Sequence, residues 1–446
     1  MAHETGHAFG LPDLYDTDRG GGTEGIGEWG LMSSGNYARP SSPSSFEAWS
    51  LVQLGWVAVD TLGSGRTIDA RAVQLSDTVY HVATDLPGVS LLLENRQAIG
   101  PDTAMMNPSF ARAKGPGLLV WRIDAPRIAS ALSSNTVNVG SNPGVALIQA
   151  DGLEQLRSSI TGYRNRGDGG DPWPGTSGRT TFGLMSDPAA RNWDLLAPLG
   201  LRLDRIVASA DGRVRVRLVR GGVLRVTSRI PQGRVTVDGV TTTQWNEIVA
   251  NGDTLSITVD TLQLSAVGRT AARFTGWSDG GPRSRTMAIG ADPPAELHAG
   301  FDVLHQLRVR VSGAGTATST YPAAIGDGTF IASGTSTRIA AVPAGGAEFV
   351  SWRGDTVSAQ PMLDLAMHRP WSVTAEFVTP VAVDPVIATR ALLGGNALSG
   401  SATAYLDTTG NRNGVYDVGD LLAWLRRTGQ AVPPALARLR AGGVTR

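Results

Sequence analysis

Residues 1–37 read MAHETGHAFGLPDLYDTDRGGGTEGIGEWGLMSSGNY and contain the pattern His3-Glu4-x-x-His7. Residues four apart lie on one face of a helix, so His3 and His7 can place two imidazole nitrogens on one metal ion. Glu4 would project beside that ion, where a carboxylate can take a proton from bound water. A glycine after the helix would let the chain turn back, and Asp13 could then supply a third ligand. Three protein ligands and one open position describe a catalytic zinc site.

The same pattern has a simpler interpretation, because a bare His-Glu-x-x-His string also occurs by chance. It would then be an amphipathic helix with two partly exposed histidines. Here Gly10 and Asp13 follow the string, and a Gly30-Leu31-Met32 turn lies further on, a combination that chance does not supply. We therefore favour the metal site, as a hypothesis that the structural context has to support.

Several segments in the first half of the chain are similar to one known family. They read HETGHAFGLPDLYD, EGIGEWGLMSSGNY, FEAWSLVQLGWV, LLLENRQ, GPGLLVWRID, VALIQADG and GDGGDPWPGTSGRTTF, and they extend over about residues 1–220. Together they resemble the immune inhibitor A-type family of secreted bacterial zinc metalloproteases. The resemblance implies the C-terminal part of a zincin (metzincin-like) catalytic domain, which would hydrolyse peptide bonds in protein or peptide substrates.

The resemblance also assigns roles to individual residues. It implies His3 and His7 as zinc ligands, Glu4 as the general base toward metal-activated water, and Met32 as a hydrophobic floor under the metal. By position, Asp13 is the favoured third ligand. Asp16 is an alternative, because it also lies within reach of the turn.

The start of the chain departs from the family. Met1 lies two residues before His3, whereas family members carry a propeptide and an N-terminal catalytic half before this point. We therefore expect an N-terminally truncated protease, which could be inactive in this form. Its location would be extracellular or at the cell surface, with the signal peptide lost together with the missing N-terminus.

The composition excludes several classes of protein. Charges balance at 39 basic and 39 acidic residues, so nothing favours nucleic acid or an anionic membrane as partner. Cysteine is absent, which excludes disulfide scaffolds and thiolate zinc sites. No apolar run is long enough for a membrane span. With 446 residues, 41% of them hydrophobic, and 56 glycines, the chain has the composition of a turn-rich, mainly β protein with several domains.

Local patterns predict the elements that follow a zinc helix at residues 2–10. Residues 44–56 have apolar side chains at helical spacing, with Ser44 or Ser45 as the cap. Short strands then predict a β-sandwich. The predicted strands are Thr78–Ala83, Ser90–Glu94, Gly117–Ile123, Val145–Ala150 and Arg213–Leu218.

Two acidic loops of the first half could hold calcium through hard oxygen ligands. The first loop offers Asp16, Asp18, Glu24 and Glu28, and the second offers Asp168 and Asp171. The alternative for the first loop is a solvated turn in which aspartates bond to the backbone.

Residues 222–378 contain an internal repeat. Phe274-Thr-Gly-Trp277 recurs 75 residues later as Phe349-Val-Ser-Trp352, which indicates tandem copies of one module. The two copies resemble bacterial surface repeats that act as stalks or spacers. Because the two tryptophans recur at equivalent positions, we favour core packing over carbohydrate binding for them.

The last chemical pattern lies near the C-terminus. Side-chain oxygens at alternating positions, a glycine and a closing carboxylate are what a calcium loop requires. The candidate calcium ligands are Asp407, Asn411, Asn413, Asp417 and Asp420. The segment resembles one half of a dockerin, a calcium-loop module that docks onto a cohesin, although Thr409 occupies the first loop position. The alternative is an Asn/Gly turn before an amphipathic helix.

These patterns together predict six segments and leave two functional hypotheses. The first hypothesis is a secreted zinc endopeptidase. The second is a non-catalytic extracellular binding or anchoring protein of β modules, whose calcium-binding tail would contact a cell surface or a cohesin-like partner. The predicted segments are the catalytic-domain part at 1–57, the β-sandwich at 58–220, β repeats at 221–302 and 303–378, a linker at 379–386, and the dockerin-like tail at 387–446.

Overall fold

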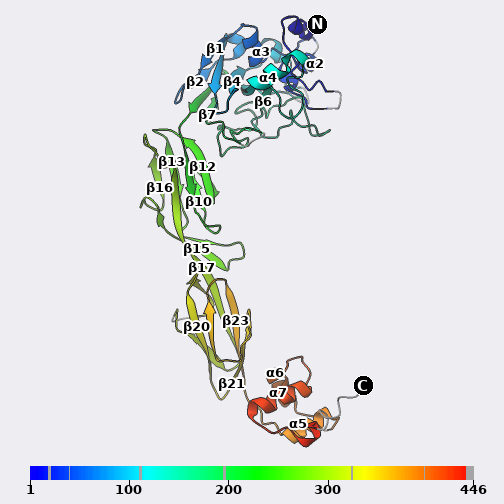
Figure 1. The fold of residues 1–446 in the computed structure, drawn as a ribbon, viewed down its shortest axis with the longest axis vertical. Coiled ribbons are helices and arrows are strands. Elements are labelled where there is room, and N and C mark those ends of the chain that lie inside the picture. Colours follow the sequence, from blue (N-terminus) through cyan, green and yellow to red (C-terminus); the bar gives the residue numbers. More distant parts are fainter. Residues whose placement is uncertain are drawn as a thin grey trace. The chain divides into compact units, whose positions relative to one another are not determined.

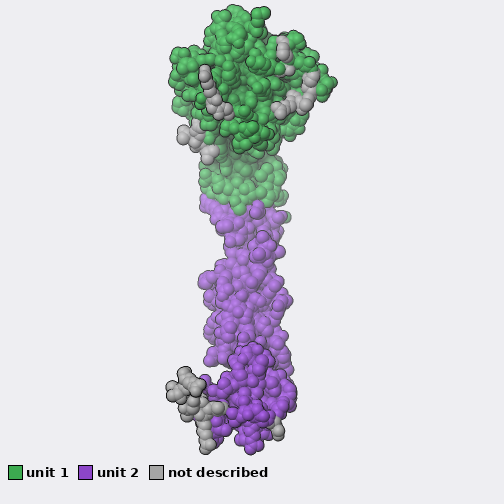
Figure 2. Space-filling view, turned by 90° about the vertical axis from the view of Figure 1, so that its right-hand side faces the viewer, with its two compact units in different colours: residues 1–227, 235–258, 277–298 green, residues 228–234, 259–276, 299–446 purple. Residues whose placement is uncertain are grey.

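The computed structural model describes residues 1–18, 22–39, 41–109, 113–193, 197–322, 325–395 and 397–437, and it is mainly β (Figure 1). The chain forms two compact units, which Figure 2 colours separately. Unit 1 comprises Met1–Thr227, Val235–Thr258 and Trp277–His298, and unit 2 comprises Ser228–Arg234, Val259–Gly276 and Ala299–Arg446. The prediction of a mainly β protein with several sheets is confirmed.

A five-stranded sheet is the central layer of unit 1. Its order is β1–β3–β4–β5–β6, with β1 and β3 parallel and the other neighbours antiparallel. The strands are β1 (Ala58–Thr61), β3 (Thr78–Ala83), β4 (Val89–Arg96), β5 (Gly117–Asp124) and β6 (Val145–Ile148). Every residue of β5 is buried, so both faces of the sheet are covered.

One face of this sheet packs on a second, smaller sheet. Successive side chains of a strand point to opposite faces, and Leu91, Leu93, Leu118 and Val120 lie in a core shared with the sheet β2–β8–β7. The smaller sheet consists of β2 (Thr67–Ala70), β8 (Val214–Val219) and β7 (Arg202–Ala208). Two sheets around one core are the arrangement expected of a β-sandwich.

The opposite face of the central sheet covers the beginning of the chain. There Leu92, Leu119 and Trp121 pack with Leu14 and Trp29 in one core. The segment before β1 contributes α1 (Ala2–Ala8), η1 (Gly27–Trp29), α2 (Gly35–Ala38) and α3 (Ala48–Gln53). The connections within the sheet contribute η2 (Val73–Leu75), η3 (Gly100–Thr103), α4 (Ala125–Ala131) and η4 (Leu132–Ser134). Of the 20 buried residues described in this core, 13 come from the chain after residue 57, and seven of these lie in strands of the central sheet.

The predicted helix over 44–56 is shorter in the structure, and its predicted cap at Ser44 or Ser45 is wrong. Helix α3 begins after Glu47, whose side chain accepts a hydrogen bond from the Ser50 N–H at 2.8 Å. The Ser45 backbone has other partners, because its N–H donates to Asp102 and its carbonyl accepts from Leu31. Those bonds engage the backbone of residue 45 outside the helix, so the helix starts later.

The first β repeat lies mostly in unit 1. Its strands include β9 (Gly222–Thr227), β10 (Val235–Val237), β11 (Val240–Thr242), β12 (Gln244–Val249), β13 (Thr254–Thr258) and β16 (Arg285–Ala288). They form the sheet β11–β10–β13–β16 and the pair β12–β9. Strands β14 (Leu262–Leu264) and β15 (Thr270–Trp277) complete the repeat, and β17 (Glu296–Ser312) runs on past the boundary predicted at 302/303.

Unit 2 contains the second repeat and a helical tail. The repeat has β18 (Gly315–Ser319), β19 (Asp327–Ala332), β20 (Ser336–Pro343), β21 (Glu348–Gly354), β22 (Met362–Ala366) and β23 (Trp371–Val378). The tail has α5 (Pro385–Leu392), α6 (Gly400–Thr409) and α7 (Val418–Thr428) around its own small core, and residues 438–446 of the predicted tail segment lie outside the described residues. Within the described ranges, no helix combines the length and apolar character that crossing a membrane requires.

The two repeated tryptophans are core residues. Trp277 is 5% exposed and Trp352 is fully buried. Each indole N–H donates to a backbone carbonyl further along its own repeat, Trp277 to Arg283 and Trp352 to Pro361, both at 3.3 Å. Neither ring presents an open face to a sugar, which agrees with the preference for core packing.

Candidate metal centre

Helix α1 and the turn after it bring the motif residues together. The Gly10 N–H donates to the His7 carbonyl at 2.9 Å, and the Leu11 N–H donates to the Gly6 carbonyl at 3.2 Å. This pair of bonds is a Schellman motif, which requires a left-handed residue, and Gly10 supplies it with φ of +88°. The chain therefore reverses directly after the helix, and Asp13 returns to the face that carries both histidines.

Both imidazoles are oriented by backbone carbonyls. His3 Nδ1 lies 2.7 Å from the Leu31 carbonyl oxygen, and His7 Nδ1 lies 2.8 Å from the Leu11 carbonyl oxygen. A carbonyl oxygen can only accept, so each Nδ1 donates to its carbonyl. This leaves the two Nε2 atoms as the ring nitrogens that can face one metal ion.

The third atom at this point belongs to Asp13. Its Oδ1 lies 3.0 Å from His3 Nε2 and 3.3 Å from His7 Nε2. The three candidate ligand atoms lie within 4.8 Å of one another, and Asp13 and His3 are buried while His7 is half-buried. Two imidazole nitrogens and a carboxylate oxygen are a donor set that suits zinc.

The alternative ligand Asp16 lies apart from the histidines. Its carboxylate accepts hydrogen bonds from three backbone N–H groups, those of Asp18 at 3.0 Å, Thr23 at 3.2 Å and Gly140 at 3.1 Å. These bonds organise the loop after the turn and keep both oxygens occupied. The geometry favours Asp13 over Asp16 as the third ligand.

Met32 lies under helix α1. It is fully buried, and a Cβ added at Gly6 would clash with its sulfur. Gly6 lies between the two histidines on the helix, so the thioether packs against the backbone at the point where the ligands project. This placement fits the floor expected from the resemblance.

Glu4 faces a cavity beside the histidines. The cavity has a volume of about 370 Å³, and its wall includes His3, Glu4, Tyr15 and Tyr37. Partial burial, the charge of Asp13 and a hydrogen bond with Asp13 raise the pKa of Tyr15. Glu4 itself is exposed, so its carboxylate is open to a ligand in this cavity.

A buried ionic cluster around Arg96 lies next to the Gly30-Leu31-Met32 turn. The Arg96 guanidinium donates to both oxygens of Asp102 at 2.9 Å, to Glu94 at 3.2 Å, and to the carbonyls of Trp29 and Phe46. Burial raises the pKa of Glu94 to about 7 and also raises the pKa of Glu47, which lies in the same cluster. Sequence reasoning missed these residues, although the charged run after three leucines in LLLENRQ was the available signal.

The acidic loops of the first half differ in geometry. Among the described residues, one acidic group could hold a cation besides the candidate centre, namely Asp151, Asp168 and Asp171. Asp171 is buried there and already accepts bonds from Trp29 Nε1, Gln149 Nε2 and the Asp168 N–H. Burial raises its pKa to about 6. The four candidate calcium ligands of the first loop form no such group. Asp16, Asp18 and Glu24 line the cavity beside Glu4, but Glu24 pairs with Arg166 and Glu28 pairs with Lys114.

The C-terminal loop closes on its own hydrogen bonds. Asn411 Nδ2 and Asn413 Nδ2 both donate to Asp417 Oδ2, at 2.8 and 2.7 Å. Buried Asp420 accepts from the N–H groups of Asn411 and Asp417, and with Asp417 it forms the capping box of α7. Asp407 Oδ1 accepts from the Gly414 N–H at 3.1 Å. All five candidate ligands therefore lie in or next to one loop. Some of their side-chain oxygens already accept hydrogen bonds from backbone N–H groups.

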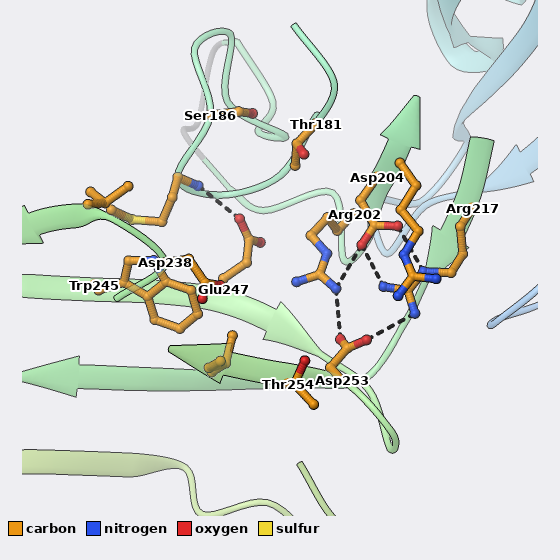
Figure 3. A pocket seen from close by; sticks show the side chains of 14 residues that line it. Thr181, Ser186, Arg202, Asp204, Arg217, Asp238, Trp245, Glu247, Asp253 and Thr254 are labelled. Carbon is orange, nitrogen blue, oxygen red and sulfur yellow. Dashed lines mark hydrogen bonds and ion pairs between the residues drawn. The ribbon is translucent and has the colours of Figure 1, made fainter. Parts of the chain in front are cut away.

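A second cavity of unit 1 is lined by ion pairs that connect strands. It has a volume of about 380 Å³ and lies where β7 and β8 meet β12 and β13 (Figure 3). On its wall Arg202 pairs with Asp204 at 3.0 Å and Asp253 at 2.7 Å, and Arg217 pairs with the same two carboxylates at 2.6 and 2.9 Å. The two arginines and the two aspartates neutralise one another's charge within the wall. We therefore interpret this network as one that connects the strands.

Comparison with known proteins agrees with the geometry at the N-terminus. Residues 1–57 match the family model described as immune inhibitor A peptidase M6, catalytic domain. The start of the chain is therefore similar to part of an M6 peptidase catalytic domain, and we refer to residues 1–57 as the M6 fragment. Residues 305–380 of the chain match a divergent InlB B-repeat domain. The predicted resemblance is thereby confirmed for the start of the chain and for the second repeat.

Individual relatives cover only part of the chain. The pre-pro-metalloprotease PrtV of Vibrio cholerae serotype O1, in two strains, is 44% identical over 111 residues, which is 22% of this chain and 12% of the relative. Immune inhibitor A of Bacillus thuringiensis subsp. alesti is 50% identical over 48 residues, which is 10% of this chain and 7% of the relative. The matched part of the chain therefore spans only about a tenth of the length of these relatives.

Proposed function

We propose that the M6 fragment and the sheet behind it form the zinc-binding part of the catalytic domain of a secreted endopeptidase. The observation that carries the proposal is the convergence of His3 Nε2, His7 Nε2 and Asp13 Oδ1. Each histidine has its other nitrogen held by a backbone carbonyl, as ligating histidines usually do. The family match supports zinc as the metal.

The residues of the centre divide the chemistry among them. Bound zinc would lower the pKa of a water molecule toward neutrality and polarise a peptide carbonyl. Glu4 follows the first ligand and lines the adjacent cavity, so its carboxylate can accept a proton there and pass it to the leaving amine. His3, His7 and Asp13 would hold the metal, while Met32 packs against the helix backbone at Gly6.

Metal analysis combined with a general protease assay tests this function. We expect the purified chain to retain one zinc per molecule, and Glu4→Gln to retain that zinc while losing any peptide hydrolysis. The physical reason is that Glu4 lies outside the ligand set but beside the cavity. Hydrolysis that persists in Glu4→Gln removes Glu4 from the role of base, and a chain that fails to bind zinc overturns the whole proposal.

A second function is favoured by the C-terminal half. The InlB B-repeat match at residues 305–380 and the helical tail support an extracellular binding or anchoring role. In this version the tail binds calcium through Asp407, Asn411, Asn413, Asp417 and Asp420, and it contacts a cell surface or a cohesin-like partner. A chain that retains zinc without cleaving any peptide, but adheres to cells through residues 303–446, supports this second function over the first.

A further inference from the structure

Asp13 is held by one side chain from far along the chain. The Asp13 N–H donates to Asn135 Oδ1 at 2.7 Å, and Asn135 Nδ2 donates to Asp13 Oδ2 at 2.7 Å. The Asn135 amide therefore closes a ring with the backbone and the carboxylate of the same residue. Because the Asp13 N–H can only donate, the amide oxygen must face it, and the amide nitrogen must face the carboxylate.

This ring determines which oxygen meets the histidines. With Oδ2 engaged by Asn135, Oδ1 is the atom that lies 3.0 Å from His3 Nε2 and 3.3 Å from His7 Nε2. Asp13 is only 6% exposed, so little water is available to orient the carboxylate instead. The amide thus selects one rotation of the carboxylate.

Neighbours of Asn135 hold the rest of the turn. The Asn135 carbonyl accepts from Thr17 Oγ1 at 3.1 Å, Asn138 Nδ2 donates to the Leu14 carbonyl at 2.8 Å, and the Gly140 N–H donates to Asp16 at 3.1 Å. The loop from 135 to 140 therefore forms hydrogen bonds along the whole segment from 13 to 17. It follows η4 and leads back into β6, which ties the turn to the central sheet.

The backbone at Asn135 restricts the residue type. Asn135 has φ of +55° and ψ of +39°, the left-handed conformation that glycine and asparagine adopt most readily. Of these two residues, only asparagine also offers a donor and an acceptor to Asp13. An aspartate would adopt the backbone but would place a second carboxylate against the first.

We propose that Asn135, from the sandwich segment, is the positioning residue of the zinc site, since it fixes the Asp13 carboxylate in the orientation that binds the metal. The proposal rests on the zinc function proposed above. It adds a residue that lies 122 positions after Asp13 and outside the M6 match at residues 1–57. Asn135 acts through Asp13 and does not touch the metal.

The test compares zinc affinity in the full chain, measured by competition with a chromophoric chelator. Asn135→Gly removes the amide and keeps the left-handed backbone without strain, and we expect about 10- to 100-fold weaker zinc binding. Asn135→Asp should bind at least as weakly, because it puts a negative charge beside Asp13 Oδ2. Thr17→Val is the matched control, since it removes a bond to the same loop that does not involve Asp13, and it should retain wild-type affinity.

Two further readouts separate positioning from general loss of structure. The visible spectrum of the cobalt-substituted chain should change in Asn135→Gly and stay unchanged in Thr17→Val, because it reports ligand geometry. In an Asp13→Ala background, Asn135→Gly should weaken metal binding by less than twofold, because the residue acts only through Asp13.

The outcomes distinguish this proposal from the zinc function itself. A wild-type chain without zinc defeats the proposed function. A wild-type chain that binds zinc, with Asn135→Gly binding equally well or losing affinity just as much without Asp13, defeats the positioning role alone.

Discussion

Gly6 is placed where its missing side chain matters most. It lies on α1 between the two histidines, and a Cβ there would clash with the sulfur of Met32. In an ordinary helix an alanine would be more stable than glycine by about 1 kcal/mol. Here the clash opposes that preference, because Met32 is fully buried and cannot move aside freely.

We expect Gly6→Ala to lower the stability of the chain by about 1–3 kcal/mol, the range typical of overpacking in a tight core. It should weaken zinc binding as well, because Met32 or the helix has to shift. Thermal unfolding and chelator competition measure the two effects. Gly63→Ala is the control, since a Cβ at Gly63 meets nothing within 4 Å. A Gly6→Ala chain that is more stable than wild type would show that Met32 does not press on the helix.

Glu94 makes the stability of unit 1 depend on pH. Burial raises its pKa from 4.5 to about 7. The positive charge of Arg96, which also pairs with Asp102, opposes this rise but does not cancel it. Between these two pH values the folded chain holds a proton that the unfolded chain releases. The contribution of Glu94 to stability therefore falls as pH rises from about 4.5 to about 7, and it does not change further above that range.

We expect Glu94→Gln to remove this slope, by on the order of 1–3 kcal/mol across the range. Glutamine keeps the oxygen that accepts from Trp121 and Arg96. The difference in free energy of unfolding between variant and wild type, measured from pH 4.5 to 7.5, gives the result. Glu154→Gln, at a half-exposed carboxylate, serves as the control substitution. Parallel curves for wild type and Glu94→Gln would mean that Glu94 does not titrate in this range.

Residue positions in the centre were predictable only where they are close in sequence. The helical spacing of His3 and His7 predicts their shared face, and Gly10 predicts the turn that brings back Asp13. Asn135 and Arg96 follow no such local rule, because their contacts depend on how the sheet closes. Asn135 bonds to Asp13, 122 positions away, and Arg96 also reaches the Trp29 carbonyl, 67 positions away; one sequence cannot identify such distant pairs.

At the scale of elements, strands were easier to predict than helices. The predicted strand Thr78–Ala83 coincides with β3, and Gly117–Ile123 lies within β5. Their β-branched and leucine-rich stretches end at turn residues, which marks both limits. Helix α3 begins later than predicted because Ser45 bonds to Asp102 across the fold, a tertiary contact that overrides a local cap.

The tail loop tests the calcium prediction at this scale. Asp417 and Asp420 lie side by side as the capping box of α7, so two carboxylates face one loop. We expect calcium to bind there and to raise the unfolding temperature of the tail, because carboxylate and amide oxygens are ligands that calcium prefers. Titration calorimetry of the full chain with calcium, and with magnesium for comparison, measures the effect.

Asp417→Asn should abolish the calcium response. Asp384→Asn alters the cap of α5 instead and serves as the control. If millimolar calcium produces neither heat nor a thermal shift in the wild-type chain, the loop is a capped turn only.

At the scale of the whole molecule, the M6 fragment depends on the sandwich. Its core residues Leu14, Trp29 and Trp49 pack against Leu119 and Trp121 of the central sheet. Separated from that sheet, these side chains would be exposed to water, at a cost of about 25 cal/mol for each Å² of apolar surface.

We expect residues 1–57 expressed alone to lack cooperative unfolding and to bind zinc far more weakly than residues 1–298, which include all of unit 1. Circular dichroism, tryptophan fluorescence and chelator competition compare the two fragments with the full chain. If residues 1–57 bind zinc as tightly as the full chain, the sheet and Asn135 are dispensable for the centre.

The hydrogen bonds between the 135–140 loop and the turn at Asp13 have a consequence for biosynthesis. A ribosome releases the histidines and Asp13 first, and the asparagine that orients the carboxylate follows 122 residues later. At ordinary elongation rates this delay is on the order of ten seconds. If Asn135 orients the carboxylate as proposed, the nascent ligands would stay loosely arranged during that interval, and tight binding of an ion would have to wait until the sandwich has been synthesised.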